Sequence, residues 1–271
     1  MEYKQNLHIH SNFCDGADTP EEMVLTAIEK GFDSIGFSGH SYTHYAPTYS
    51  MSLEGTLDYI KEINRLKAKY AEKIKIFCGL EFDMYSGVDL SPYDYIIGAV
   101  HYLEIGGGKI GFDRSAAEVK RVIDTYFGGD GMKYAKAYYK TLAKLPDYGK
   151  FDIIGHFDII TKHLENADFF DTDSKEYRNS AISALEALKG KIPCFEVNTG
   201  AIARGYRTTP YPQPFLLDEF KRLGFKAVIS SDCHNRTMLN CGYDDAAELL
   251  KQHGFKEIFA LTDNGFKPFA L

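Results

Sequence analysis

The sequence predicts an α/β protein with a parallel sheet, organised as one domain over residues 1–271. Short apolar runs followed by amphipathic stretches recur about seven or eight times, which is the pattern of strand-helix units. The length of 271 residues is close to that of one α/β barrel. No linker rich in proline, glycine or serine divides the chain, so one barrel is the better interpretation.

The composition excludes several classes of protein. Hydrophobic residues make up 44% and charged residues 25%, as in soluble globular proteins. No stretch resembles a secretory signal or a membrane span, so we expect a cytoplasmic protein with no membrane partner. The net charge of −7 argues against long nucleic acid as a partner, and nothing indicates the oligomeric state. The 5 cysteines are scattered without a Cys-x-x-Cys pair, which fits a reducing compartment.

The strands and helices follow from the apolar pattern and from the residues that bound it. The first helix has the clearest ends, because Thr19 can cap it, Pro20 suits its first position, Glu22 completes a capping box and Gly31 ends it. We predict strands at 6–10, 33–38, 74–81, 95–101, 151–156, 194–198 and 226–232, with 257–261 as an eighth candidate. Further helices are predicted at 52–73, 116–127, 132–145, 174–189, 215–223 and 246–253.

Histidines and carboxylates fall at or just after the ends of these strands. In a parallel barrel the carboxyl ends of all strands meet at one face, so residues far apart in the sequence converge there. Side chains two apart on a strand point the same way, which pairs His8 with His10 and Asp232 with His234. The candidate metal ligands are His8, His10, Asp15, His40, Glu81, His101, His156, Asp232 and His234.

This set of ligands indicates both the kind and the number of metal ions. Imidazole nitrogens mixed with carboxylate oxygens suit zinc, manganese or iron. If Glu81 bridges two ions, the candidate ligands supply about ten bonds, which would nearly saturate two ions but leave open positions on three. We therefore predict three divalent transition-metal ions, whose excess positive charge suits a small phosphate ester.

A lone histidine after a strand is usually a packed or surface residue. A metal site is nevertheless favoured here, because most of the 9 histidines of the chain lie at or just after predicted strand ends. Among the others, only His44, in the loop after His40, is a candidate for substrate contact. Glu196 shares a face with Asn198 at a strand end, where a role at the metals and a purely structural role are both open.

Two arginines are candidates for anion binding. Arg204 and Arg207 lie in a loop that follows a strand ending near the predicted metals, and guanidinium groups bind phosphate with two hydrogen bonds. Either could instead be a solvated loop residue, and Arg114 is a weaker candidate. Cys14 and Cys233 adjoin proposed ligands, but we interpret both as structural.

Motifs in one order cover nearly the whole chain. They are His8-Ile9-His10-Ser11-Asn12-Phe13-Cys14-Asp15-Gly16, Gly39-His40, Gly79-Leu80-Glu81, Val100-His101, Gly155-His156-Phe157-Asp158 and Ser231-Asp232-Cys233-His234. In this order the sequence resembles the PHP family, named for polymerase and histidinol phosphatase. The resemblance implies a distorted (β/α)7 barrel with a trinuclear metal centre at the carboxyl ends of the strands.

One further segment resembles the histidinol-phosphatase branch of that family. It runs from Glu196 to Gly200 and continues through Arg204 to Pro210-Tyr211-Pro212. The resemblance implies that Arg204 binds phosphate and that the reaction is hydrolysis of L-histidinol phosphate. It also implies a metal-bridging hydroxide as the nucleophile. Candidate catalytic residues are Glu81, Asp232 and His234, and the leaving alkoxide would take its proton from a metal-bound water, from Asp232 or from a nearby histidine.

Three alternatives stay open at this point. The first is a PHP phosphoesterase for another small phosphomonoester or a nucleotide. The second is an amidohydrolase, which would be expected to use a bridging lysine where Glu81 stands here. The third is a metal-dependent sensor that binds a phosphorylated ligand without turnover.

Overall fold

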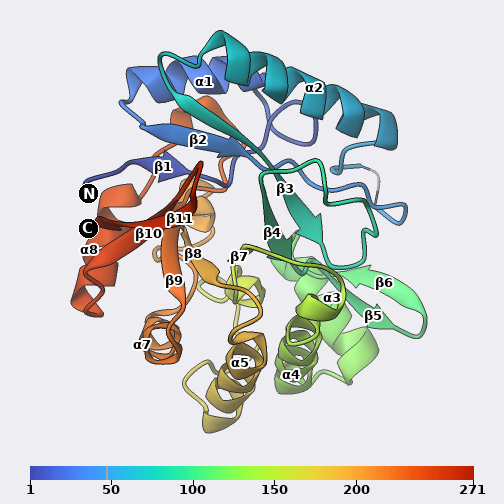
Figure 1. Ribbon diagram of the computed structural model, residues 1–271. Coiled ribbons are helices and arrows are strands. Elements are labelled where there is room, and N and C mark those ends of the chain that lie inside the picture. Colours follow the sequence, from blue (N-terminus) through green and yellow to red (C-terminus); the bar gives the residue numbers. More distant parts are fainter. Residues whose placement is uncertain (47) are drawn as a thin grey trace.

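Seven parallel strands form a nearly closed barrel in the computed structural model, which describes residues 1–46 and 48–271 (Figure 1). The order of neighbouring strands is β1-β2-β3-β4-β7-β8-β9. The predicted α/β barrel is therefore confirmed. The barrel strands are β1 (Gln5–Asn6), β2 (Ser34–Phe37), β3 (Lys75–Asp83), β4 (Tyr95–Ala99), β7 (Ile153–Ile154), β8 (Cys194–Asn198) and β9 (Lys226–Ser230).

Closure of the barrel brings its first strand, β1, and its last strand, β9, together. Ile9, just past β1, forms a parallel bridge with Cys233, just past β9. The backbone N–H of His10 donates to the carbonyl of Cys233 at 3.0 Å. Strand ends from the first and last parts of the sequence therefore lie side by side at the face where active sites of such barrels are built.

Helices pack around the outside of the barrel (Figure 1). Helix α1 begins as predicted, because Thr19 and Glu22 each accept a hydrogen bond from the other's backbone. Among the described residues no helix is long and apolar enough to cross a membrane. The helices are α1 (Pro20–Glu29), α2 (Leu53–Lys69), α3 (Ala116–Phe127), α4 (Gly131–Leu142), α5 (Lys175–Leu188), α6 (Gly200–Ala203), α7 (Pro214–Leu223) and α8 (Tyr243–Gln252), with short 3-10 helices at Leu145–Asp147, Ile159–Thr161 and Arg236–Met238.

Two hairpins depart from the predicted strand-helix pattern. The eighth candidate strand does not join the parallel sheet, because β10 (Glu257–Thr262) pairs antiparallel with β11 (Gly265–Ala270). The second hairpin, β5 (Tyr102–Ile105) and β6 (Gly108–Gly111), follows β4 and projects from the barrel (Figure 1). It turns at Gly106 and Gly107, both with positive φ, a conformation that glycine adopts without strain.

The barrel interior is apolar at the end opposite the histidines. Tyr95 is buried there, and its hydroxyl donates to the carbonyls of Leu7 at 2.5 Å and Phe37 at 3.1 Å. This leaves the polar side chains to the other end of the barrel. The interior cluster consists of Leu7, Phe77, Tyr95, Ile97, Ile153, Cys194, Val228 and Leu261.

Candidate metal centre

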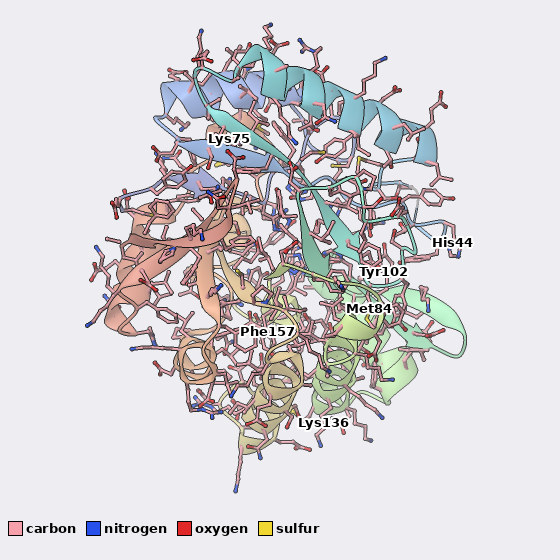
Figure 2. All side chains as sticks on the ribbon, in the orientation of Figure 1. His44, Lys75, Met84, Tyr102, Lys136 and Phe157 are labelled. Atoms are coloured by element: carbon pink, nitrogen blue, oxygen red, sulfur yellow. The ribbon has the colours of Figure 1, made fainter. Side chains whose placement is uncertain are left out.

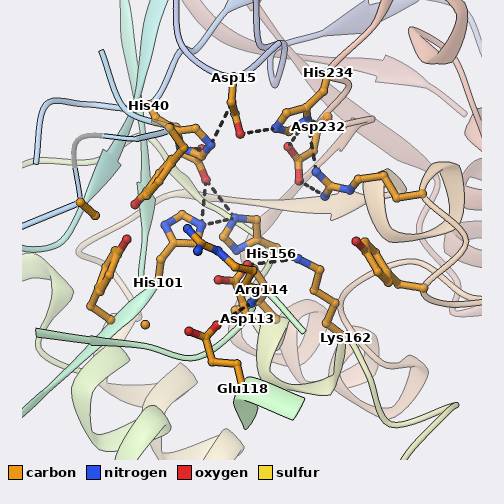
Figure 3. Close-up of a pocket in the computed structure, with 18 of the residues that line it drawn as sticks. Asp15, His40, His101, Asp113, Arg114, Glu118, His156, Lys162, Asp232 and His234 are labelled. Atoms are coloured by element: carbon orange, nitrogen blue, oxygen red, sulfur yellow. Dashed lines mark hydrogen bonds and ion pairs between the residues drawn. The ribbon is translucent and has the colours of Figure 1, made fainter. Parts of the chain in front are cut away.

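The structure brings all nine predicted ligands to the carboxyl ends of the barrel strands. Figure 3 labels six of them, namely Asp15, His40, His101, His156, Asp232 and His234. Each stands in a barrel strand, just after one or in the loop that follows it, as a parallel barrel requires. They fall into three groups of closely spaced donor atoms, with His10 shared between two of them. The groups are His10, Asp15, His40 and His234; His8, His10 and Asp232; and Glu81, His101 and His156.

Glu81 lies at the centre of the cluster. Its Oε1 is 2.9 Å from Nε2 of His156 and 3.5 Å from Nε2 of His101. Its Oε2 is 2.7 Å from Nδ1 of His40 and 3.4 Å from Nε2 of His8. The two oxygens of one carboxylate thus face different sets of histidines, which is the arrangement that a bridging ligand requires.

Asp232 and Asp15 occupy the side of the cluster away from His101. Oδ1 of Asp232 is 3.2 Å from Nε2 of His10 and 3.6 Å from Nε2 of His8. Oδ1 of Asp15 is 3.6 Å from Nε2 of His40, and its Oδ2 is 3.4 Å from Nε2 of His234. Asp232 therefore contacts the two histidines that follow β1, and Asp15 brings together His40, which follows β2, and His234, which follows β9.

Several atoms of this cluster are buried and have polar neighbours but form no well-aligned hydrogen bond. They are Nε2 of His8, Nε2 of His10 and Oε2 of Glu81. Unpaired buried polar atoms are costly, and in native structures such groups usually have a partner. Nitrogen and oxygen donors that converge in this way suit a divalent transition metal, so the residues fit the metal ions that the sequence predicts.

The electrostatics of the cluster follow from burial and from the mixture of charges. Burial would raise the pKa of Glu81, but the histidines His40 and His8 hold it well below its usual range. Burial would lower the pKa of His101, yet Glu81 and Asp83 raise it to about 9. Burial lowers the pKa of His10 to about 3. Without metal, the carboxylates are thus ionised and are neutralised by some of the histidines.

A cavity of about 590 Å³ opens onto this cluster. Tyrosine rings form much of its wall, namely those of Tyr45, Tyr49, Tyr102, Tyr206 and Tyr211. Asp113, Arg114, Glu118 and Lys162 line the side opposite Asp15 (Figure 3). The volume is in the range that holds a small organic molecule.

Arg204 lies in this cavity beside two of the predicted ligands. It donates from Nη2 to Oδ2 of Asp232 at 2.9 Å, and its Nη1 is 3.2 Å from Nδ1 of His234. Its side chain keeps 32% of its surface exposed, so one edge of the guanidinium faces the cavity. A phosphate group in the cavity would find this cation next to the metal ligands.

The structure places Arg207 and His44 away from the cavity wall. Arg207 is buried, donates to Thr161 and Thr209, and stacks on the ring of Tyr211, so its guanidinium is used within the protein. His44 is exposed at the edge of the molecule (Figure 2). Neither residue is among those that line the cavity, so a direct contact of either with substrate stays a prediction that this geometry does not support.

The cysteines beside the cluster are thiols, as their interpretation as structural residues requires. Burial raises the pKa of Cys14 to about 11 and that of Cys233 to about 12. Thiols with such values hold no thiolate near neutral pH and are poor nucleophiles.

Sequence reasoning missed several residues of the cavity. Asp113 and Lys162 form an ion pair at 3.1 Å, and Lys162 lowers the pKa of Asp113 to about 2 although burial acts in the other direction. Neither residue stands at the end of a strand predicted from the sequence, so the rule that found the histidines could not find them. Asp83 was not predicted either. Its oxygen Oδ2 lies 3.2 Å from Nδ1 of His101, and its place two residues after Glu81 on the same strand is the signal that could have found it.

Fold and site together define an α/β barrel whose strand ends carry a histidine and carboxylate cluster able to bind metal. A sequence profile of the PHP domain matches residues 6–200, more than half of the chain. The chain belongs to the PHP domain family.

Similarity to individual proteins extends over nearly the full length. A histidinol-phosphatase of Lactococcus lactis is 29% identical over 97% of this chain and 96% of its own. A histidinol-phosphatase of Bacillus subtilis is 25% identical over 89% of this chain and 97% of its own. A structure of histidinol phosphate phosphatase from Lactococcus lactis, solved with zinc, L-histidinol and phosphate, superposes with a TM-score of 0.72 at 25% identity, covering 97% of this chain and 98% of the other.

Proposed function

We propose that this protein is a metal-dependent phosphomonoesterase that hydrolyses L-histidinol phosphate to L-histidinol and phosphate. The observation that carries the proposal is the Glu81-centred cluster at the strand ends, in a chain similar over nearly its whole length to histidinol-phosphatases. The complex of the Lactococcus lactis enzyme with zinc, L-histidinol and phosphate supports the choice of substrate.

The three groups of donor atoms are the proposed positions of three divalent ions, zinc, manganese or iron. Their ligands would be His8, His10, Asp15, His40, Glu81, His101, His156, Asp232 and His234. When bound, such ions supply positive charge for the phosphate oxygens and lower the pKa of water enough to give a nucleophile near neutral pH.

The side chains around the cluster would position the substrate. Arg204 would bind the phosphate oxygens, because its guanidinium lies in the cavity beside Asp232 and His234. Asp232 and His234 are the proposed residues for proton transfer to the leaving alkoxide, since both line the cavity and both contact Arg204.

The wall opposite Asp15 suits the alcohol part of this substrate. L-histidinol carries an amine and an imidazole, which are basic nitrogen groups. The carboxylates of Asp113 and Glu118 and the ring faces of Tyr45 and Tyr102 are groups that attract such cations.

The test is a phosphate-release assay on the purified protein with metal content measured on the same sample. The panel contains L-histidinol phosphate, other small phosphomonoesters and short nucleotides. We expect kcat/KM to be highest for L-histidinol phosphate and to vanish on chelation. A higher kcat/KM for another ester would assign a different substrate. Tight binding of phosphate without turnover of any ester would indicate a sensor.

A further inference from the structure

Glu196 is a buried carboxylate that stands behind the proposed metal ligands. It lies on β8, is 1% exposed and does not line the cavity. Its Oε2 is 2.9 Å from Nδ1 of His8 and accepts a hydrogen bond from Oγ of Ser230 at 2.6 Å. Its Oε1 accepts hydrogen bonds from the backbone N–H of His156 at 2.6 Å and from Nδ2 of Asn198 at 2.8 Å.

These contacts occupy the whole accepting capacity of the carboxylate. An ionised carboxyl group has two oxygens and about four acceptor sites, and four groups surround Glu196. No acceptor site is left for a metal ion. We therefore expect Glu196 to act on the metal centre through its neighbours and not as a ligand.

The contact with His8 determines which ring nitrogen is free. A carboxylate at 2.9 Å from Nδ1 requires the proton of the ring on Nδ1. In the neutral ring, which is the form that binds metal, Nε2 then carries the lone pair, and this atom is buried and faces Glu81 and Asp232. The same carboxylate holds the backbone of His156, so two strand ends are fixed by one residue.

We propose that Glu196 is a positioning residue of the metal centre, which fixes the Nδ1–H tautomer of His8 and thereby directs Nε2 to the metal. This role rests on the proposed metal-dependent function and deepens it. Groups that hold a metal-ligating histidine from behind are typically worth a factor of 10 to 100 in metal affinity.

Glu196→Gln tests this role, because the hydrogen-bond donors around position 196 determine which side of the new amide, the oxygen or the NH2 group, faces His8. The N–H of His156 is backbone and cannot become an acceptor. Nδ2 of Asn198 is also fixed as a donor, because its Oδ1 accepts the N–H of Gly200 at 2.8 Å. The amide oxygen must therefore take the place of Oε1, and the NH2 group must face His8 and Ser230.

This orientation reverses the tautomer of His8. Nδ1 must then accept a hydrogen bond from the new NH2 group, which moves the ring proton to Nε2. A protonated Nε2 cannot bind metal, although the size of the side chain at position 196 is nearly unchanged. Glu196→Asp keeps the accepting charge and so the native tautomer, at the cost of a shorter reach.

The matched control is Asp152→Asn, which also converts a carboxylate to an amide. Asp152 accepts the N–H of Ile96 at 2.8 Å and precedes β7, at the end of the barrel away from the metal ligands. Both variants lose one negative charge and one good acceptor between strands. Only Glu196→Gln changes the partner of a proposed ligand.

The experiment measures zinc affinity and zinc content of the full chain by competition with a chromophoric chelator, together with nitrogen NMR of the histidine rings. We expect Glu196→Gln to lose 10- to 100-fold in affinity for at least one zinc ion. In metal-free samples, at a pH high enough for the histidine rings to be neutral, it should show one more Nε2–H ring than wild type. Glu196→Asp should retain more affinity than Glu196→Gln, and Asp152→Asn should bind as wild type does.

Equal affinity and equal tautomers in wild type and Glu196→Gln would overturn the role of Glu196 and leave the proposed function intact. Wild-type protein that binds no zinc, manganese or iron would overturn both. If Glu196→Gln does not fold, Glu196→Asp decides. Its shorter side chain weakens the hydrogen bond to Nδ1 of His8, so the positioning role predicts a measurable loss of zinc affinity, whereas a purely structural role predicts lower stability with unchanged zinc affinity.

Discussion

Glu81 concentrates the charge of the cluster in a single side chain. Glu81→Gln keeps the shape but removes the negative charge between His156 on one side and His40 on the other. We expect the variant to lose at least one metal ion and at least 100-fold in kcat, because a neutral amide bridges cations poorly. Metal analysis and phosphate release on one preparation check this, and near-normal values of both would show that Glu81 is not a bridge.

Arg204 is proposed to contact the substrate itself, through its phosphate group. Arg204→Ala should leave metal content unchanged but weaken the binding of substrate and of free phosphate, at a cost of about 2 to 5 kcal/mol for a buried charged contact. Arg204→Lys should recover only part of this, because an ammonium cannot form two parallel hydrogen bonds. The measurements are KM and the inhibition constant of phosphate.

Arg207 provides the control for that experiment. Its guanidinium donates to Thr161 and Thr209 inside the protein, so Arg207→Ala should lower the melting temperature and leave KM and phosphate inhibition nearly unchanged. If Arg207→Ala weakened phosphate binding and Arg204→Ala did not, the phosphate contact would belong to the other arginine.

Residues of the site could be predicted from the sequence where a side chain that can bind metal stands at the end of a predicted strand. His40, His101 and His156 are rare residue types at regular places, so the pattern alone placed them. Arg207 shows the limit of prediction from sequence. Its position in the sequence places it near the site, but its buried hydrogen bonds determine which way its side chain points. Tyr49 and Lys162 reach the cavity through the folding of long loops, which periodicity does not describe.

At the scale of elements, the packing of β3 against the barrel interior depends on one small residue. A Cβ on Gly79 would overlap the ring of Tyr95, which is buried and held by two backbone carbonyls. Gly79→Ala should therefore destabilise the protein by about 1 to 3 kcal/mol or more. Combining it with Tyr95→Leu should cost less than the sum of the two, by about 1 kcal/mol or more, as measured by urea unfolding.

Gly108→Ala on β6 is the control for this pair. The nearest atoms to its added Cβ lie at 3.7 Å, an ordinary contact distance, and we expect little change in stability. Additive effects of Gly79→Ala and Tyr95→Leu would mean that the ring moves aside and that the close packing of β3 is not required.

The two hairpins show why some elements were not predicted. The run Gly106-Gly107 between apolar residues is a hairpin signal that a search for strand-helix units passes over. For β10 the apolar pattern correctly indicated a strand but not its partner. Pairing depends on the turn and on contacts with the rest of the molecule, such as the backbone of Leu261 bonding to the side chain of Gln5.

At the scale of the whole molecule, the proposed ions would join the ends of the chain. His8 and His10 come from the first strand, while Asp232 and His234 follow the last strand of the barrel. A ligand present at 100 times its dissociation constant stabilises a protein by about 2.7 kcal/mol. For a chain of 271 residues that corresponds to a melting temperature about 5 °C higher than that of the metal-free protein.

Calorimetry of chelated, metal-loaded and reloaded samples checks this prediction. Recovery of the higher melting temperature on adding zinc or manganese excludes irreversible damage by the chelator. The same melting temperature with and without metal would mean that the cluster does not bind ions tightly in the folded protein.

The overall barrel could be predicted because length, periodicity and strand-end chemistry agree on it. Seven of the eight candidate strands lie in the parallel sheet. The way the barrel closes could not be read from the pattern, since the bridge from Ile9 to Cys233 depends on the sum of all the twists between them.

That closure has a consequence for how the protein is made. Asn6 and Ser231, which are hydrogen-bonded beneath the cluster, are 225 residues apart in the sequence. At about 5 to 20 residues per second, the ribosome needs on the order of tens of seconds to bridge that distance. During this time His8 and His10 have been synthesised, but Asp232 and His234 have not. Assembly of the full metal site therefore belongs to the end of synthesis, when nearly the whole barrel is available to fold.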